Sequence, residues 1–215
     1  MGNMAIYELL QREPRVWLGG GSAAPRTQST GFSALDALLP GGGWPVGALT
    51  ELYPSAHGIG EFTLLLPLLT RLTQAGRRVA LIAPPYIPYS QALAWHGVKL
   101  DKLVLLSPER ASDVLWAMEQ TLASKSIALA VGWPKRAIER DLRRLQLAAE
   151  TGESCAVLYR APRDAAQNSP AALRLKLAPA VPGLRVDVFK ARGGHPSGVT
   201  LHPPAALPLR SAAAA

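Results

Sequence analysis

The sequence is poor in the residues that most often carry metal or covalent chemistry. Among 215 residues there is one cysteine, Cys155, and there are four histidines. A single thiol rules out a disulfide framework within the chain, and the apolar run around Cys155 predicts a buried structural thiol. The histidines lack metal-ligand spacing, and no Ser/His/Asp or paired-carboxylate arrangement stands out. We therefore expect neither a metal site nor a catalytic centre of these kinds.

Long apolar runs and targeting signals are also missing. No apolar run approaches the ~18 residues of a membrane-spanning helix. Residues 1–11 show neither the basic start nor the apolar stretch of a secretory signal peptide. These features predict a cytoplasmic protein without membrane contact.

Acidic residues are scarce relative to basic ones. The chain carries 23 Lys and Arg against 15 Asp and Glu, a formal charge of +8 and a pI of about 10.1. Residues 1–134 hold ten basic and nine acidic residues, whereas residues 135–192 hold twelve and six. A basic C-terminal half indicates a polyanionic partner such as nucleic acid, or an acidic protein surface. The alternative is that arginine is simply frequent in a composition rich in Ala, Leu and Pro, and the sequence leaves both interpretations open.

A nucleotide-binding loop is present in outline but lacks its working residues. The pattern predicts a strand over 47–53, a glycine-containing loop and a helix over 63–75, which together form the geometry that cradles phosphates. After its last glycine such a loop needs a Lys for the phosphates and a Ser or Thr for Mg²⁺, but Glu61 and Phe62 stand there. We therefore interpret the loop as a tight connection kept by the fold and expect no cofactor, with a working nucleotide loop as the lesser alternative. The loop residues are Pro54, Ser55, Ala56, His57, Gly58, Ile59, Gly60 and Glu61.

The order of the expected elements predicts the fold class. Strands and helices alternate to about residue 160, and two or three strands then follow without helices between them. This order predicts an α/β fold with a mostly parallel sheet, helices on both faces and an antiparallel C-terminal edge. We expect an N-terminal helix and linker over 1–28, a core over 29–202 and a disordered tail over 203–215, where Pro and Ala dominate.

Two helices after the loop have clear patterns. Residues 112–124 place Leu115, Met118 and Leu122 on an apolar stripe with Trp116 beside it, which predicts that all four side chains belong to the core. Residues 135–151 predict an amphipathic helix whose arginines mostly face away from its apolar stripe. Both helices should therefore pack on the sheet.

The residues from 29 to 51 carry a first resemblance. Ser-Thr-Gly, a short helix, a glycine run and a strand ending in Glu51 resemble the entry to a RecA-like core of the P-loop NTPase type. Hydrolysis by that fold needs a Glu after the second strand and an Asp that ends a later strand to hold Mg²⁺. Those positions fall within residues 83–86 and at Gly132 or Trp133, where no carboxylate stands. The resemblance therefore implies a fold kept without catalysis, and we expect no enzyme activity.

Most of the chain resembles the ImuA family, which are RecA-like proteins associated with translesion DNA synthesis. The most specific blocks are Gly-Ile-Gly-Glu at 58–61 and Leu-Arg-Arg-Leu-Gln-Leu-Ala-Ala-Glu at 142–150. The resemblance implies an SOS-induced, non-catalytic accessory protein of damage-induced mutagenesis. The implied partners are an ImuB-type polymerase-like protein and an error-prone replicative-type polymerase, with RecA and DNA as further contacts.

The middle of the chain is also similar, more distantly, to the SulA family of cell-division inhibitors. The similarity lies around the Leu-rich helix and around Val131-Gly132-Trp133. It implies an alternative function, in which the protein is an SOS inhibitor that caps a division polymer. A third hypothesis, an ATPase with displaced catalytic groups, rests only on the fold.

If DNA is a partner, the basic half supplies the candidate contacts. In RecA-like cores the segment after the strand that ends near Arg160 faces the axis where DNA runs, so the resemblance adds Gln167 and Asn168. Contacts of this kind would be to phosphates and independent of base sequence. The alternative is that Arg143 and Arg144 pair with Asp141 or Glu150, or with the acidic face of a partner. The basic candidates are Lys135, Arg136, Arg140, Arg143, Arg144, Arg160, Arg163, Lys190 and Arg192.

Overall fold

The computed structural model describes residues 26–202. The expected N-terminal helix and the expected disordered tail over 203–215 lie outside the described residues. Within the described part of the chain, no helix combines the length and apolar character needed to cross a membrane.

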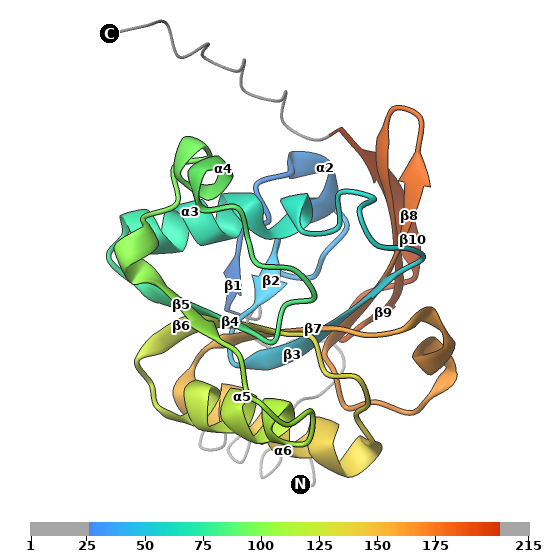
Figure 1. The fold of residues 1–215 in the computed structure, drawn as a ribbon. Helices are drawn as coiled ribbons and strands as arrows, with labels where there is room; N and C mark the ends of the chain where they lie inside the picture. Colours follow the sequence, from blue (N-terminus) through green and yellow to red (C-terminus); the bar gives the residue numbers. More distant parts are fainter. Residues whose placement is uncertain (1–25, 203–215) are drawn as a thin grey trace, which may run out of the picture.

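The molecule is built on an eight-stranded sheet with the strand order β10-β9-β8-β3-β7-β6-β4-β5 (Figure 1). All neighbouring pairs from β8 to β5 run parallel, whereas β9 is antiparallel to both β8 and β10. The expected mostly parallel sheet with an antiparallel C-terminal edge is thus confirmed. Two short strands, β1 (Thr27–Gln28) and β2 (Trp44–Pro45), form a separate sheet. The strands of the large sheet are β3 (Ala48–Pro54), β4 (Arg78–Ile82), β5 (Leu103–Leu106), β6 (Ile127–Gly132), β7 (Cys155–Tyr159), β8 (Leu173–Ala180), β9 (Gly183–Ala191) and β10 (Ser197–Leu201).

Helices cover both faces of this sheet, as expected. Figure 1 shows α2, α3 and α4 on one face and α5 and α6 on the other. The apolar stretch after the loop starts as a 3-10 turn and continues as α3, with a proline in its first turn, where no backbone N–H is needed. The helices are α2 (Ser33–Asp36), α3 (Leu66–Gln74), α4 (Ser90–Trp95), α5 (Asp113–Ala123) and α6 (Glu139–Gly152), with 3-10 turns at Thr63–Leu65, Leu100–Lys102 and Pro162–Ala166.

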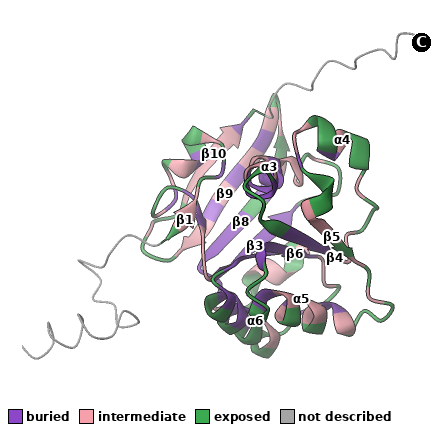
Figure 2. Ribbon diagram, turned by 90° about the vertical axis from the view of Figure 1, so that its left-hand side faces the viewer, coloured by how far each residue is buried: buried purple, intermediate pink, exposed green. Residues whose placement is uncertain are grey.

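The core lies in two layers, one on each face of the sheet. In β4, Val79 and Leu81 join the cluster under α3, while Ala80 and Ile82 join the cluster under α5 and α6. This alternation follows from the two-residue period of a strand, and it explains why strands covered on both faces have continuous apolar sequences. Figure 2 shows the buried residues concentrated in the sheet between the two helical layers. Cys155, in β7, is 2% exposed, so the expected buried thiol is confirmed.

The structure corrects the start of the last helix. The helix expected over 135–151 begins at Glu139, and Ile138 before it is extended, with ψ of 168°. The carboxylate of Asp141 accepts a hydrogen bond from the backbone N–H of Ile138 at 3.1 Å, which satisfies a free donor at the helix start. Residues 135–138 therefore precede the helix and do not form its first turn.

Two further expectations are corrected by the structure. Trp116 is 60% exposed, because Val114, Met118 and Leu122 form the buried stripe of α5 and Trp116 lies two residues away from it on the other side. The end of the expected N-terminal linker is a strand, since Thr27–Gln28 pairs antiparallel with Trp44–Pro45.

Candidate functional site

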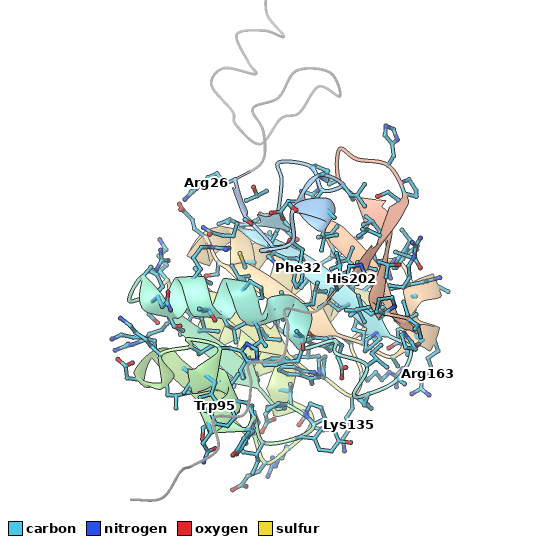
Figure 3. All side chains as sticks on the ribbon, turned by 90° about the horizontal axis from the view of Figure 1, so that it is seen from above. Arg26, Phe32, Trp95, Lys135, Arg163 and His202 are labelled. Atoms are coloured by element: carbon cyan, nitrogen blue, oxygen red, sulfur yellow. The ribbon has the colours of Figure 1, made fainter. Side chains whose placement is uncertain are left out.

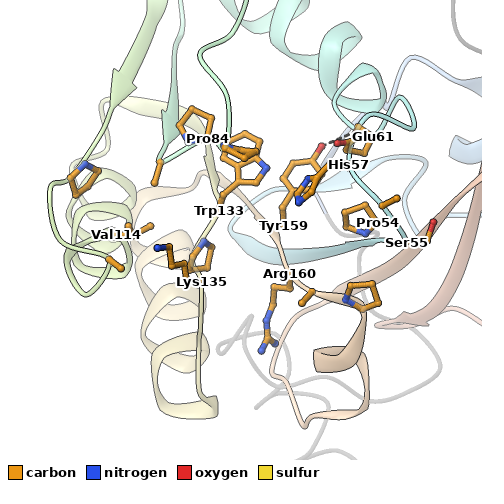
Figure 4. Close-up of a pocket in the computed structure, with 18 of the residues that line it drawn as sticks. Pro54, Ser55, His57, Glu61, Pro84, Val114, Trp133, Lys135, Tyr159 and Arg160 are labelled. Atoms are coloured by element: carbon orange, nitrogen blue, oxygen red, sulfur yellow. Dashed lines mark hydrogen bonds between the residues drawn. The ribbon is translucent and has the colours of Figure 1, made fainter.

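A cleft of about 600 Å³ opens at the carboxyl ends of β3, β4, β6 and β7 (Figure 4). Open α/β sheets bind their ligands at this edge, outside the carboxyl ends of the strands. The walls come from the loop after β3, from Ala83 to Pro85, from Trp133 to Lys135 and from Tyr159 to Pro162. Segments far apart in the sequence thus meet here because their strands are neighbours in the sheet.

The loop after β3 binds its own carboxylate. The Glu61 side chain accepts a hydrogen bond from the backbone N–H of Gly58 at 3.1 Å. In a phosphate-binding loop such an N–H would be directed at an anion of the ligand. Gly58 and Gly60 have φ of 79° and 89°, values that favour glycine, so the turn itself explains both residues. The Glu61 carboxylate therefore accepts the hydrogen bond of a backbone N–H that a nucleotide phosphate would need.

The other loop residues divide between core and surface. Pro54 is buried at the end of β3 and Ile59 packs against the core, whereas the residues from Ser55 to Gly58 are exposed. Among these, Ser55, Ala56 and His57 line the cleft. The loop is therefore held at both ends and open in its middle.

Aromatic side chains form one wall of the cleft. The rings of Trp133 and Tyr159 are stacked, with centroids 4.9 Å apart and planes inclined by 4°, and Phe62 lies 6.2 Å from Trp133. The Tyr159 hydroxyl donates a hydrogen bond to the backbone carbonyl of Glu61 at 2.8 Å (Figure 4). Burial raises the pKa of Tyr159 well above its ordinary value, so the phenol stays protonated and keeps this bond. Phe62, at the position of the missing Mg²⁺ ligand, is part of the aromatic packing.

The end of β6 has no room for a metal-binding side chain. A Cβ added at Gly132 would lie 2.7 Å from the sulfur of Met118 and 3.3 Å from Leu158. An Asp at this position would displace core side chains. Within residues 26–202, no group of three or more His, Cys, Asp and Glu side chains could hold a metal ion.

A buried ion network ties together the strands beneath the cleft. Glu51, in β3, is 0% exposed and accepts hydrogen bonds from Arg160 at 2.7 Å and from Arg174 at 2.8 Å. Arg174 also donates to the hydroxyl of Tyr53 and stacks on the ring of Phe189. Burial is the main cause that raises the pKa of Tyr53 to about 12. This network was not predicted, although a Glu inside the otherwise apolar strand β3 is a signal that a buried partner exists.

The buried position of Arg160 excludes it from the candidate phosphate contacts. It is 4% exposed, and besides Glu51 its guanidinium donates to the Ala137 carbonyl at 3.0 Å and to the Gln167 side chain at 2.8 Å. Its donors are therefore used to connect β7 with the segment before α6 and with the loop after β7.

Three basic candidates do come together, at a second hollow beside the cleft. Lys135, Arg136 and Arg163 are exposed and line a groove of about 470 Å³, together with Gln167 and Asn168. Two carboxylates, Glu139 and Asp164, line it as well, so its basic residues exceed its acidic ones by one. Figure 3 shows Lys135 and Arg163 on the same side of the molecule. Lys135 lines the cleft as well, so the two hollows adjoin. We call the second hollow the basic groove.

The remaining basic candidates are dispersed. Arg143 pairs with Glu139 and Arg144 pairs with Glu119, while Arg140 is exposed on the same helix. The two arginines thus form surface ion pairs, as the alternative expected, but with Glu139 and Glu119 in place of Asp141 and Glu150.

Lys190 and Arg192 lie at the end of β9 and brace the loop that follows β7. Lys190 donates to the Ser169 carbonyl at 2.7 Å, and Arg192 donates to the Pro170 carbonyl at 3.4 Å. Burial, followed by the charges of Arg174 and Arg192, lowers the pKa of Lys190. The Lys190 ammonium therefore holds the loop in place by its hydrogen bond to Ser169.

Comparison with known proteins identifies relatives of the central part of the chain. The family described as "Cell division inhibitor SulA" matches residues 47–156, from the start of β3 into β7. Cell division inhibitor SulA of Serratia marcescens is 30% identical over 118 residues, which cover 55% of this chain and 70% of that protein. SulA of Edwardsiella piscicida is 35% identical over 97 residues, covering 44% and 56%. Protein RecA of Deinococcus radiodurans is 32% identical over 123 residues, covering 53% of this chain but 33% of RecA.

Proposed function

The chain belongs to the SulA family of cell division inhibitors, and from this premise we propose that it acts by binding a protein partner, without nucleotide turnover, in the response to DNA damage. The observation that carries the proposal is the loop after β3. There Glu61 holds the Gly58 amide, and Phe62 packs beside Trp133 where a Mg²⁺ ligand would be needed. The first candidate partner is the polymer of a tubulin-like division GTPase, which the protein would cap.

A rigid apolar projection beside the cleft supports protein binding. Tyr86, Ile87 and Tyr89 are 73%, 88% and 62% exposed, and prolines at 84, 85 and 88 bracket them. Exposed aromatic side chains are frequent hot spots of interfaces, and proline reduces the entropy lost when such a loop is immobilised. We call residues 84–89 the projecting loop.

A polymerisation assay tests this function. We expect the mass of sedimented division polymer to fall as the protein is added, already at less than one protein per GTPase subunit, because a cap needs to occupy only the polymer ends. Replacing both Tyr86 and Ile87 by Ser should abolish the effect without loss of stability, because both side chains are exposed. Leu147→Ser, also at an exposed position but on α6, is the matched control and should inhibit normally. Polymer mass that stays constant at a several-fold excess of protein would contradict the proposal.

A second candidate function is that of an accessory protein in translesion synthesis. The specific observation in its favour is that residues 157–202 lie beyond the SulA family match yet supply β8, β9, β10 and one wall of the basic groove, with Arg163, Gln167 and Asn168. The likeness to the ImuA family extends into this part. On this proposal the partners are an ImuB-type protein, an error-prone polymerase and RecA, and the basic groove contacts DNA phosphates.

The DNA contact makes a quantitative prediction. Replacing Arg136 and Arg163 together by Ala should weaken binding to single-stranded DNA of any sequence. The slope of log affinity against log salt should flatten by about one to two units, at roughly −0.7 per phosphate neutralised. Arg78→Ala, an exposed arginine at the start of β4, is the matched control and should change neither quantity. Binding that is independent of salt, or unaffected by the double substitution, would assign the basic groove to protein recognition instead.

Affinity capture distinguishes the two candidates. With the tagged protein as bait in damage-treated cells, recovery of a division GTPase supports the first, and recovery of polymerase-type proteins supports the second. The variant in which Tyr86 and Ile87 are both Ser should lose the partner if the projecting loop is the contact.

A further inference from the structure

The cleft has the lining of a site for extended, proline-containing peptides. It is lined by six prolines and by the half-buried Trp133, whose ring is stacked on the buried Tyr159. Grooves built from aromatic rings and other flat apolar surfaces recognise polyproline II segments, which arrive already ordered and lose little entropy. The cleft is also lined by Glu61, which is held by the Gly58 amide, by Lys135 and by the exposed Glu109. Glu109 is thus the carboxylate available to pair with a basic residue of such a peptide.

The last strand of the sheet, β10, ends at the edge of the sheet where the cleft lies. Because β9 is antiparallel to both of its neighbours, β10 runs in the same direction as β8 and β3. Leu201 therefore ends at the same edge of the sheet as the cleft. Leu201 also lines a small hollow together with Ile59 and Gly60, directly before the cleft residue Glu61.

The distance is within reach of the next few residues. Three strand spacings separate β10 from β3, which at about 4.8 Å each is roughly 14 Å. A polyproline II segment rises about 3.1 Å per residue, so eight residues span roughly 25 Å. Residues 203–210 are thus long enough to pass the loop after β3 and enter the cleft.

The sequence of these residues fits the cleft. It is Pro-Pro-Ala-Ala-Leu-Pro-Leu-Arg, in which the prolines fix the backbone dihedral of polyproline II, Leu207 and Leu209 are apolar, and Arg210 is the only charge. From this chemistry and the course of β10 we propose that Pro203–Arg210 of this chain binds in the cleft. A partner that uses the cleft must then displace this segment. The inference holds for either candidate partner.

Peptide binding to an opened cleft tests the proposal. The probe is a fluorescein-labelled peptide of residues 203–215, and the readout is anisotropy. We expect the chain truncated after His202 to bind the peptide at least tenfold more tightly than the full chain, whose own segment competes at a high effective concentration. The full chain with Leu207→Asp and Leu209→Asp should bind the peptide as the truncated chain does, which gives a second open cleft if truncation impairs folding.

Matched variants locate the site. On the truncated chain, Ala111→Arg places a large basic side chain on the exposed rim of the cleft and should weaken binding at least fivefold. Ala75→Arg, equally exposed at the end of α3, should not. Equal peptide affinity for the full and open chains, no binding to either open chain, or indifference to Ala111→Arg would each overturn the proposal.

Discussion

Glu51 and its two arginines show how single residues determine the organisation of the sheet. A buried carboxylate is costly to desolvate, and an ion pair in the interior contributes little net stability compared with apolar side chains of the same volume. What Glu51 provides is a fixed relation between three strands, since Arg160 extends from the end of β7 and Arg174 from β8. The loop after β7 takes its position from the same contacts.

At the residue scale, the network predicts a large difference between two arginine substitutions. Arg174→Ala would leave one oxygen of the buried Glu51 carboxylate without its hydrogen-bond partner, while Arg160 still pairs with the other. It should lower the free energy of unfolding by about 2–3 kcal/mol. Arg143→Ala removes an exposed pair with Glu139 and should cost less than about 1 kcal/mol. Urea unfolding of both variants measures the difference. Similar costs for the two variants would show that the buried network is not maintained in solution.

At the scale of elements, the contact between α5 and α6 depends on Gly152. A Cβ at this position would lie 1.9 Å from the carbonyl oxygen of Leu122, so the two helix ends can approach only without a side chain. Gly152→Ala should therefore destabilise the fold by about 1–3 kcal/mol, the usual cost of overpacking, although alanine favours helices. Thermal unfolding measures this cost, with Leu147→Ala on the exposed face of α6 as the control. A stabilised Gly152→Ala variant would mean that the helix ends are further apart than described.

The elements themselves were largely predictable, and their boundaries were less so. Continuous apolar runs predicted β4, β6 and β7, because a strand that is covered on both faces has apolar side chains on both. The start of α6 was misplaced by four residues, since the amphipathic pattern extends back over 135–138 and says nothing about a cap formed by Asp141. Trp116 was misplaced because hydrophobicity alone does not fix the side of a helix on which a large side chain lies.

At the scale of the whole molecule, the cleft and the basic groove were only partly predictable. The loop from Pro54 to Glu61 and the candidates Lys135, Arg136 and Arg163 were each found in the sequence. Their grouping depends on the strand order β3-β7-β6-β4, which local patterns do not encode. For the same reason Arg160 was assigned to the surface, since its partner Glu51 lies more than a hundred positions earlier in the chain.

The whole molecule is thus a layered α/β arrangement with a partly apolar cleft at the carboxyl ends of its parallel strands. Three features of this edge act together: the Glu61 carboxylate on the loop amide, Phe62 in the aromatic packing, and Gly132 close to Met118. Glu61→Lys alone should therefore not create hydrolysis, because the missing metal and water-activating groups would still be absent.

Isothermal titration with ATP and Mg²⁺ decides whether the loop after β3 binds nucleotide. We predict no saturable heat and no change in melting temperature at millimolar nucleotide, because the loop amide and the metal position are already filled by the protein's own side chains. A ligand present at about 100 times its dissociation constant would stabilise the fold by about 2.7 kcal/mol, which a melting curve resolves easily. Saturable binding near one ATP per chain, with a matching rise in melting temperature, would contradict the account.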